Sequence, residues 1–559
     1  MKKRNIIVAA SFMAVTALGV GMLSSCTDNF EDLNTNKTQV DPNDLPFSAQ
    51  CAEPMNYCYP PHQNMFQFWT NLTIDLYGGY FETPHGNFTN CDMGENRGHS
   101  GGMYENFYLH IFNNTRRIIT SCDAKGQKGL SGVMRVVQAC GTITATDAYG
   151  PLAYSSILEG KSEEYYDFDS QQKLYEQILD DLSTATTDIA AMSEEDKANL
   201  ATFDTWGGGD PQMWIQMANT LKLRVALRLS KREAEMKADG YDLKAIATQA
   251  ASSTLAVSGK DIVVKDQSNE LKRMFDWQDC GMNANLVTLL VGMKDPRLPL
   301  YITKNSGEIT NEKGEVTPAG STYCGIRFAS GMAQKGSSGS YGYKMSQWVG
   351  DYNVPLPIFK AAEAYFLLAE AKLRWDIGSE SVQSLYEKGI RLSIKNELAY
   401  KGSWANVDKI SDAEIDAYVN GTTHQADYVD PGNSKNNCKA VNLLGVKWDN
   451  AASKEDQLAR IQTQKYIALF PLSNEAWAEQ RRTGYPRFFV ALVNKSNGAV
   501  DTEEGVRRVI YSSNAYDTNA KGIEGGLKLL DQENTSKKGI SGDKGGTHVW
   551  WDNADKGNF

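Results

Sequence analysis

Residues 461–487, IQTQKYIALFPLSNEAWAEQRRTGYPR, constrain the fold more strongly than any other stretch of this chain. Apolar side chains recur there at helical spacing up to Pro471, which ends a first predicted helix because proline lacks an amide hydrogen and clashes with the preceding turn. Ser473 or Asn474 can cap the start of a second helix, and Gly484 is a natural residue for its end. The stretch therefore predicts two helices joined by a hinge.

Two adjacent arginines, Arg481 and Arg482, fall in the last turn of the second predicted helix, beside Trp477 and Tyr485. Such a pair can bind an anionic ligand, or it can bind carboxylates and the carbonyl groups at helix ends. We expect the structural role, because the planar arginine fork commonly serves packing in this way. This stretch consequently predicts part of the helical scaffold and not a ligand-binding site.

Residues 1–25 are typical of a bacterial export signal. Three basic residues at positions 2–4 precede a mostly apolar run over residues 6–23. The run is barely long enough to span a membrane and contains two glycines, which favours a cleaved signal over a retained anchor. It ends in LSSC, the form of a lipobox, so Cys26 is predicted to carry lipid and to become the mature N-terminus.

The residues that follow Cys26 are acidic and polar, and residues 26–45 are predicted to form a tether. The chain of 559 residues is 41% hydrophobic and has no later apolar run of spanning length, which predicts one globular domain over residues 46–559. Its formal net charge of −11 suits neither nucleic acid nor a peripheral contact with anionic lipid. The acyl chain would therefore provide the membrane attachment.

Helical periodicity marks much of the chain, whereas residues 260–357, 399–455 and 488–559 are rich in loops. The predicted helical segments are residues 46–81, 104–121, 132–149, 171–192, 211–237, 358–375 and 381–396. Residues 358–396 show the small and large alternation of tetratricopeptide-like hairpins, although no regular repeat runs through the chain. The sequence predicts a mostly α fold, in which a tetratricopeptide-like scaffold carries a loop-rich, aromatic face.

Few residues point to catalysis or to a metal. The chain contains no CxxC pair and no HExxH motif, so no metal or other cofactor is predicted. His85 and His99 share the predicted loop 82–102 with acidic residues, for which a solvated polar loop is the preferred interpretation over a metal site. Residues 98–102, GHSGG, match the GxSxG nucleophile motif, but they lack the buried strand that must precede it. No catalytic residue is predicted.

Several motifs together resemble one family. They are the lipobox with its acidic tether, TDAYGPLAY at 146–154, KDPRLP at 294–299, PLP at 355–357 before EAYFLLAEA at 363–371, the stretch 461–487, and VWWD at 549–552. In this order they resemble the SusD/RagB outer-membrane lipoproteins of Bacteroidota. GPLAY at 150–154 departs from the acidic GDxPY form of that family, so a contact that needs the aspartate would be missing here.

The resemblance implies a mostly helical fold with four tetratricopeptide-like units beneath a loop-rich ligand face. It also implies a lipid-anchored protein of the outer membrane, exposed at the cell surface. Its implied partner is a SusC-like TonB-dependent transporter, over which the lipoprotein sits as a lid. The usual ligand of the family is a glycan, while the RagB branch handles oligopeptides.

Sugar rings present apolar C–H faces and polar edges, so a glycan site needs flat aromatic rings beside amides, carboxylates or arginines. Aromatic residues in predicted loops are therefore the candidates, although burial is an alternative for each. The predicted ligand-binding residues are Tyr80, Phe81, Asn87, Asp276, Trp277, Tyr323, Arg327 and Trp348. Trp214, Trp375 and Trp477 lie in helical patterns and are expected in the core.

The sequence thus predicts a cell-surface lipoprotein that captures an oligosaccharide, leaves it intact and delivers it to a transporter. An oligopeptide-binding protein of the RagB type is the first alternative. A surface glycoside hydrolase is a second, because a catalytic carboxylate pair is defined by spatial separation and not by sequence. A purely structural surface protein would leave the loop aromatics unexplained.

Overall fold

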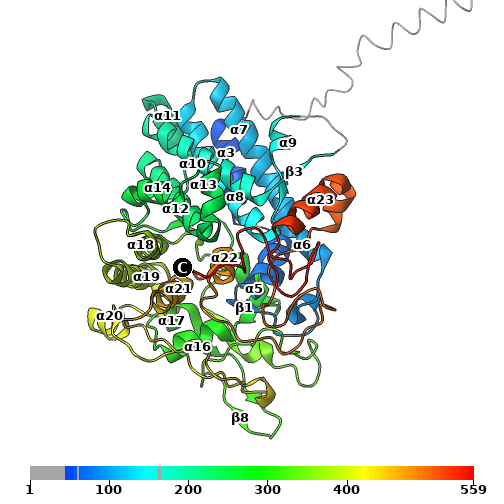
Figure 1. Cartoon of the computed structure of the whole chain (residues 1–559). Helices are drawn as coiled ribbons and strands as arrows, with labels where there is room; N and C mark the ends of the chain where they lie inside the picture. Colours follow the sequence, from blue (N-terminus) through cyan, green and yellow to red (C-terminus); the bar gives the residue numbers. More distant parts are fainter. Residues whose placement is uncertain (1–44, 60–61, 161–164, 266) are drawn as a thin grey trace, which may run out of the picture. The chain divides into compact units, whose positions relative to one another are not determined.

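The computed structural model of the chain describes residues 45–59, 62–160, 165–265 and 267–559 (Figure 1). The chain divides into two compact units, Met1–Gln50 and Cys51–Phe559. The predicted export signal, the predicted lipidation of Cys26 and the tether as far as residue 44 lie outside the described residues. The helical scaffold and its loops belong to the second unit.

The fold is mostly helical, as predicted, and its strands are short. The helices of the first half of the chain are α3 (Phe47–Asn56), α4 (Gln63–Phe66), α5 (Asp75–Tyr77), α6 (Arg97–Asn106), α7 (Asn113–Ala124), α8 (Lys128–Tyr149), α9 (Ser155–Leu158), α10 (Gln171–Ala190), α11 (Glu194–Phe203), α12 (Pro211–Arg228), α13 (Glu233–Ala238) and α14 (Leu243–Ala250). Those of the second half are α15 (Glu270–Asp276), α16 (Ala284–Gly292), α17 (Leu298–Tyr301), α18 (Ala361–Trp375), α19 (Val382–Ala405), α20 (Asp412–Val419), α21 (Lys454–Leu469), α22 (Ser473–Thr483) and α23 (Ser513–Glu533). Two π-helical stretches, Gln67–Ile74 and Phe107–Phe112, join α4 to α5 and α6 to α7.

Within the described residues, the strands form five two-stranded antiparallel sheets. The pairs are β1 (Phe81–Glu82) with β5 (Gly281–Met282), β2 (Leu152–Ala153) with β3 (Phe168–Asp169), β4 (Ile262–Val264) with β10 (Leu356–Phe359), β6 (Ile302–Asn305) with β9 (Ser346–Trp348), and β7 (Ile309–Thr310) with β8 (Val316–Thr317). Most of these pairs join segments far apart in sequence, so they fasten the loops to the helical scaffold.

The scaffold consists of helices that pack on their neighbours in sequence. Helix α7 packs against α8, α8 against α10, and α10 against α12, which also contacts α14. A second group is formed by α18, α19, α21 and α22, and α12 joins the two groups through α18. Figure 1 shows these helices stacked as successive pairs, with the loop-rich segments around β8 and α16 at the lower end of the view. This is the predicted tetratricopeptide-like arrangement.

Side-chain caps determine where several of these helices begin. Ser170, Ser193 and Ser381 precede α10, α11 and α19, and each hydroxyl accepts a hydrogen bond from the backbone amide three residues later. Such a cap satisfies an amide that has no partner inside the helix. The start of each of these helices is thus determined by residues near it in the sequence, whereas the packing of the helix is not.

The hairpin predicted for residues 461–487 is confirmed as α21 and α22. Helix α22 ends at Gly484, whose φ of 80° lies in the left-handed region that glycine adopts without strain. The capping role predicted for Ser473 or Asn474 is wrong, because the helix begins earlier than expected. The N-cap is Leu472, and Ser473 lies in the first turn, where its hydroxyl bonds to the Asp75 carboxylate of α5.

Helices are also present in segments predicted to be loops or rich in loops. Helix α6 begins at Arg97, in the predicted loop 82–102, while α15, α16 and α17 lie within 260–357, α20 within 399–455 and α23 within 488–559. Helix α23 was not predicted because its sequence contains three glycines, which lower helix propensity. Tertiary packing overrides that propensity: a Cβ on Gly526 would lie 2.4 Å from the Phe168 ring, so β3 approaches the helix only because this residue is glycine.

Candidate ligand-binding site

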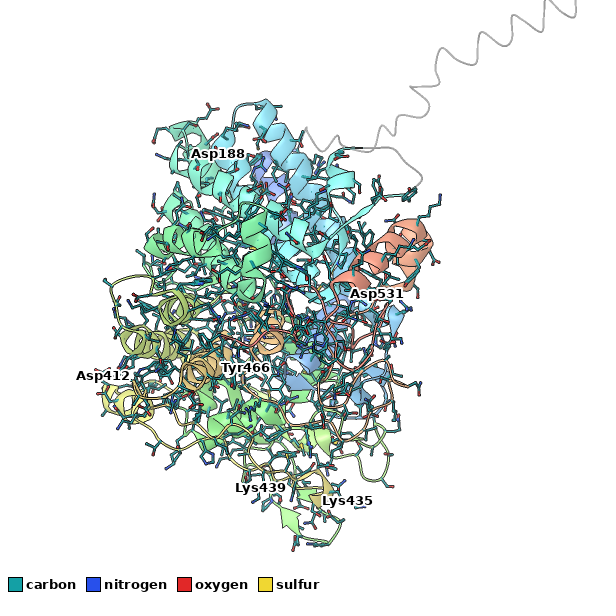
Figure 2. The ribbon with its side chains drawn as sticks, in the orientation of Figure 1. Asp188, Asp412, Lys435, Lys439, Tyr466 and Asp531 are labelled. Carbon is teal, nitrogen blue, oxygen red and sulfur yellow. The ribbon has the colours of Figure 1, made fainter. Side chains whose placement is uncertain are left out.

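Two of the predicted ligand-binding residues, Tyr80 and Phe81, belong to the core. Their exposed fractions are 0% and 1%, and the Tyr80 hydroxyl donates to the backbone carbonyl of Tyr466 in α21. The Phe81 ring packs on Phe470 with centroids 5.4 Å apart. Figure 2 shows Tyr466 in the interior of the fold. Neither residue presents a free ring face, so the structure gives no support to their predicted contact with a ligand.

Trp348 and Arg327 are also buried, with 5% and 7% exposure. Trp348 lies in β9, and its ring faces the ammonium group of Lys401 at 5.1 Å. The guanidinium of Arg327 donates to the carbonyl of Asn436 at 3.1 Å and to that of Val490. Both side chains therefore hold loops in place, and ligand contact by either would first require those contacts to break.

Three of the predicted residues lie together: Lys335 joins Asn87 to Trp277, and Asp276 is next to Trp277 in the chain. The side-chain oxygen of Asn87 accepts a hydrogen bond from the Lys335 backbone amide at 2.9 Å. The Lys335 ammonium donates to the Trp277 carbonyl and, at 3.0 Å, to the Asp279 carboxylate. Asp276 is the residue before Trp277, at the end of α15. We call Asn87, Asp276, Trp277, Asp279 and Lys335 the Lys335 site.

Asp279 anchors the Lys335 site to the scaffold. Its carboxylate accepts from Gln67 at 3.0 Å and contacts the His85 ring nitrogen Nε2 at 3.0 Å, in addition to Lys335. Burial alone would raise the pKa of Asp279, but hydrogen bonds from His85 and Lys335 hold it below its ordinary value. The group therefore stays ionised, and three chain segments remain fixed around it.

The other edge of the Lys335 site is held by Tyr352. Its hydroxyl donates to the Asp276 carboxylate at 2.8 Å, while the guanidinium of Arg273 lies 5.2 Å from its ring. Partial burial opposes the ionisation of Asp276, yet hydrogen bonds from Lys272 and Tyr352 lower its pKa. This edge consequently presents a charged carboxylate beside an aromatic ring.

The backbone after α15 is strained where it carries Trp277 into the site. Gln278 is exposed and has a φ of 59°, in the left-handed region that residues other than glycine enter at a cost. Such strain persists only where surrounding contacts enforce it, and it gathers at ligand sites. Here the contacts of Asp279 enforce it. Trp277 is left half-buried, with its ring partly packed on the core and partly open to solvent.

Tyr323 lies on a different segment, before β9. Its ring is half-buried and has the Lys304 ammonium 6.0 Å from its centre, and burial raises the pKa of its hydroxyl. Tyr323 therefore keeps an accessible aromatic surface, but its ring faces Lys304, which is not one of the residues of the Lys335 site. Of the predicted aromatic residues, Trp277 and Tyr323 are the two that retain exposed surface.

The predicted ligand-binding residues did not include Lys335, Asp279 or Tyr352. Lys335 belongs to residues 330–342, a segment rich in glycine and serine in which no pattern distinguishes one polar residue from another. Asp279 lies two positions after Trp277, and this proximity was the available signal. The role of His85 as its buried partner depends on a contact across 194 positions, which local sequence does not encode.

The serine and the histidine of the GHSGG string both make structural contacts. Ser100 of the GHSGG string lies in α6, is buried and donates its hydroxyl hydrogen to the Arg97 carbonyl at 3.0 Å, so it is not on a strand-to-helix elbow. His99 contacts the Asn90 side chain at 2.9 Å. Throughout the described part of the chain, no three histidine, cysteine or acidic residues are grouped closely enough to hold a metal ion.

The described residues also bear on membrane attachment and on cysteine chemistry. No helix among them is long and apolar enough to cross a membrane. The eight cysteines from Cys51 to Cys438 are free thiols, five of them buried. Burial raises the pKa of Cys324 to about 11, which keeps this thiol protonated and unreactive.

Comparison with known proteins agrees with this architecture. A family model described as SusD-like, Susd and RagB outer membrane lipoprotein, matches residues 29–552. A chitin-binding SusD homologue from Flavobacterium johnsoniae is 28% identical, with a TM-score of 0.77 over 92% of this chain and 99% of the homologue. No curated protein matches the chain.

Two SusD homologues from Bacteroides are similar to the same extent. The one from Bacteroides vulgatus is 26% identical, with a TM-score of 0.76 over 92% of this chain and 98% of its own. The one from Bacteroides thetaiotaomicron is 25% identical, with a TM-score of 0.77 over 92% of this chain and 99% of its own. Since the family match extends over nearly the whole sequence, the chain belongs to the SusD-like family of outer membrane lipoproteins.

Proposed function

We propose that this protein binds an oligosaccharide at the Lys335 site, leaves it chemically unchanged and delivers it to a SusC-like TonB-dependent transporter. The observation that carries the proposal is the half-buried Trp277, whose backbone carbonyl accepts a hydrogen bond from Lys335. Asp276 precedes Trp277 in the chain, and the Asn87 side chain bonds to the Lys335 backbone amide. A sugar can stack its C–H face on such a ring while its hydroxyls bond to the amide, carboxylate and ammonium groups. The chitin-binding homologue supports a glycan ligand over a peptide.

The same proposal places the protein at the cell surface, held in the outer membrane by lipid on Cys26. Residues 1–25 would be removed as the export signal, and residues 26–45 would tether the globular domain of residues 46–559. The family description as outer membrane lipoproteins supports this arrangement. The mass of the mature N-terminal peptide tests it: an acylated Cys26 is expected, and an N-terminus upstream of Cys26 without lipid contradicts it. Co-purification from the outer membrane tests the transporter partner.

Calorimetry of the purified domain against a panel of neutral oligosaccharides, chitin fragments included, tests the ligand class. Trp277→Ala should weaken binding about fivefold, since an aromatic contact contributes on the order of 1 kcal/mol. Trp277→Phe keeps a stacking ring and should retain most of the affinity. Tyr241→Ala, which removes a tyrosine bonded to Asp180 in the helical scaffold, is the matched control and should bind like the wild type.

Three results would contradict this function. Unchanged affinity in Trp277→Ala would remove the Lys335 site from ligand binding. Binding of oligopeptides alone would establish the RagB-type alternative. Release of shorter sugars from a bound oligosaccharide, detected by chromatography, would show that the protein is a glycoside hydrolase.

A further inference from the structure

A groove with a volume of about 400 Å³ lies between the α6–α7 helix, α9 and α23. Its lining includes Tyr104, Tyr108 and Asn113 on the first helix, and Asn514 and Asn519 on α23. Figure 1 shows α23 beside α6 and β3. None of the residues of the Lys335 site lines this groove. Its volume falls within the range of small-molecule pockets.

A kink in α23 builds one wall of the groove. Asn519 has non-helical backbone angles, φ −148° and ψ 50°, in the middle of this 21-residue helix. Its side chain pairs with the backbone of Tyr166, accepting from the amide at 3.0 Å and donating to the carbonyl at 2.8 Å. A Cβ on Gly522 would lie 2.2 Å from that same carbonyl oxygen, so only glycine permits the approach. The pairing holds Tyr166 at the rim with 39% of its surface exposed.

The opposite wall presents a second tyrosine in a fixed orientation. The Tyr108 hydroxyl donates to the Ala153 carbonyl at 3.0 Å, and its ring packs edge-on against Tyr104 with centroids 4.8 Å apart. Tyr108 remains half-buried, and the adjacent Leu109 is 62% exposed. Two tyrosine rings and an aliphatic side chain therefore face the groove from elements that are fixed by hydrogen bonds to the backbone.

Polar groups of balanced charge surround these rings. The Asn514 amide donates to Glu105 at 3.1 Å, and the Arg116 guanidinium donates to Asn113 at 3.1 Å. One carboxylate and one guanidinium leave the lining without net charge, which fits a neutral ligand better than an anion. Amides, a carboxylate and a guanidinium next to aromatic rings supply both donors and acceptors for hydroxyl groups.

We propose that this groove is a second oligosaccharide-binding site, which takes a short neutral sugar chain with its rings against Tyr108 and Tyr166. The proposal rests on the proposed function only for the class of ligand, because the groove and the Lys335 site share no residue. A second site on the same domain would raise the residence time of a long glycan through effective concentration, once both sites hold one chain.

Calorimetry with short chitin fragments and with a panel of other neutral oligosaccharides tests the groove. The wild type should bind two equivalents of a short ligand, and Tyr166→Ala/Asn514→Ala should bind one, with the remaining affinity unchanged. Tyr165→Ala removes the neighbouring ring, which lies against Lys521 and not in the groove, and should keep both equivalents. In Trp277→Ala the groove should be the site that remains.

Hydrogen exchange provides an independent measurement that does not depend on a variant. Addition of the ligand should slow amide exchange in residues 104–116 and 513–519 of the wild type. A single equivalent that Trp277→Ala abolishes, with no protection of these segments, would overturn the second site and leave the proposed function intact. Absence of any glycan binding by the wild type would overturn both.

Discussion

Lys401 in α19 is a cationic residue enclosed by aromatic rings. It is 1% exposed, and its ammonium lies 5.1 to 5.4 Å from the ring centres of Tyr301, Trp348 and Phe470. Burial lowers the pKa of Lys401 to about 7, although the nearby Glu397 carboxylate opposes the shift. The rings favour the charged form through cation–π contacts, but less than water would. This residue therefore reduces stability at neutral pH.

We expect Lys401→Met to raise the free energy of unfolding by about 1–4 kcal/mol at pH 7. Between pH 7 and 10.5 the unfolded chain binds a proton on Lys401 that the folded chain does not, so wild-type stability rises with pH there. The gain in the variant should consequently be greatest at or below pH 7 and should shrink toward pH 10. Urea unfolding at several pH values measures it.

Lys395→Met is the control for this substitution, since Lys395 is exposed on the same helix. It should change stability little and without a trend in pH. A Lys401→Met difference that stays constant from pH 7 to pH 10 would contradict the lowered pKa of the buried lysine.

At the scale of elements, helix α23 shows how glycines decide what can pack together. Gly522 lies under the Tyr166 carbonyl, whereas a Cβ on Gly525 would meet no atom within 4 Å. Both glycines lower helix propensity equally. Their effects in the folded protein should therefore have opposite signs.

Gly522→Ala should lower the free energy of unfolding by about 1–3 kcal/mol, because its methyl group would displace Tyr166 and Asn519. Gly525→Ala should raise it by about 0.5–1 kcal/mol, the usual gain from replacing a glycine inside a helix. Thermal and urea unfolding of the two variants side by side measure these shifts. Equal effects at the two positions would show that the contact between α23 and Tyr166 is absent in solution.

The elements also show what sequence can predict. The hairpin of α21 and α22 was predictable because Pro471 and Gly484 act locally, through a missing amide hydrogen and a left-handed backbone angle. The burial of Trp348 was not predictable, because a tryptophan in a polar, glycine-rich segment resembles a surface residue in sequence, while its burial depends on contact with α19. Asn87, Asp276 and Trp277 of the Lys335 site were named from the sequence, but the contact between Asn87 and Trp277 is made by a lysine distant from both in sequence.

At the scale of the whole molecule, a buried network of charges joins the two groups of scaffold helices. Four of its cations and four of its carboxylates come from α12, α18, α21 and α22 and balance one another: Arg224, Arg228, Lys465 and Arg482 with Glu363, Glu370, Glu475 and Glu479. Arg482 confirms the structural role expected for the arginine pair, because it binds Glu370 and Glu479 at 2.7 and 2.6 Å. Arg481 binds the carbonyls of Asp147 and Arg507.

Glu479 is the carboxylate on which most of this network depends. It contacts Arg228 at 3.3 Å, Lys465 at 3.2 Å and Arg482 at 2.6 Å, and it is 3% exposed. Burial would raise its pKa, but these three cations, Arg482 foremost, hold the pKa well below its ordinary value. A carboxylate with a lowered pKa stabilises the fold above its ordinary value of 4.5, and this contribution is lost as the pH falls.

We expect Glu479→Gln to lower the free energy of unfolding by about 3–5 kcal/mol at neutral pH, because three buried cations lose their shared partner. The loss should diminish below about pH 4.5, because the unfolded wild-type chain takes up a proton on Glu479 there and the stabilising contribution of the ionised carboxylate decreases. Glu524→Gln, which breaks an exposed pair with Lys528 on α23, should leave the free energy of unfolding nearly unchanged. If urea unfolding gave similar losses for both variants, the network would not be what holds α12, α18, α21 and α22 together.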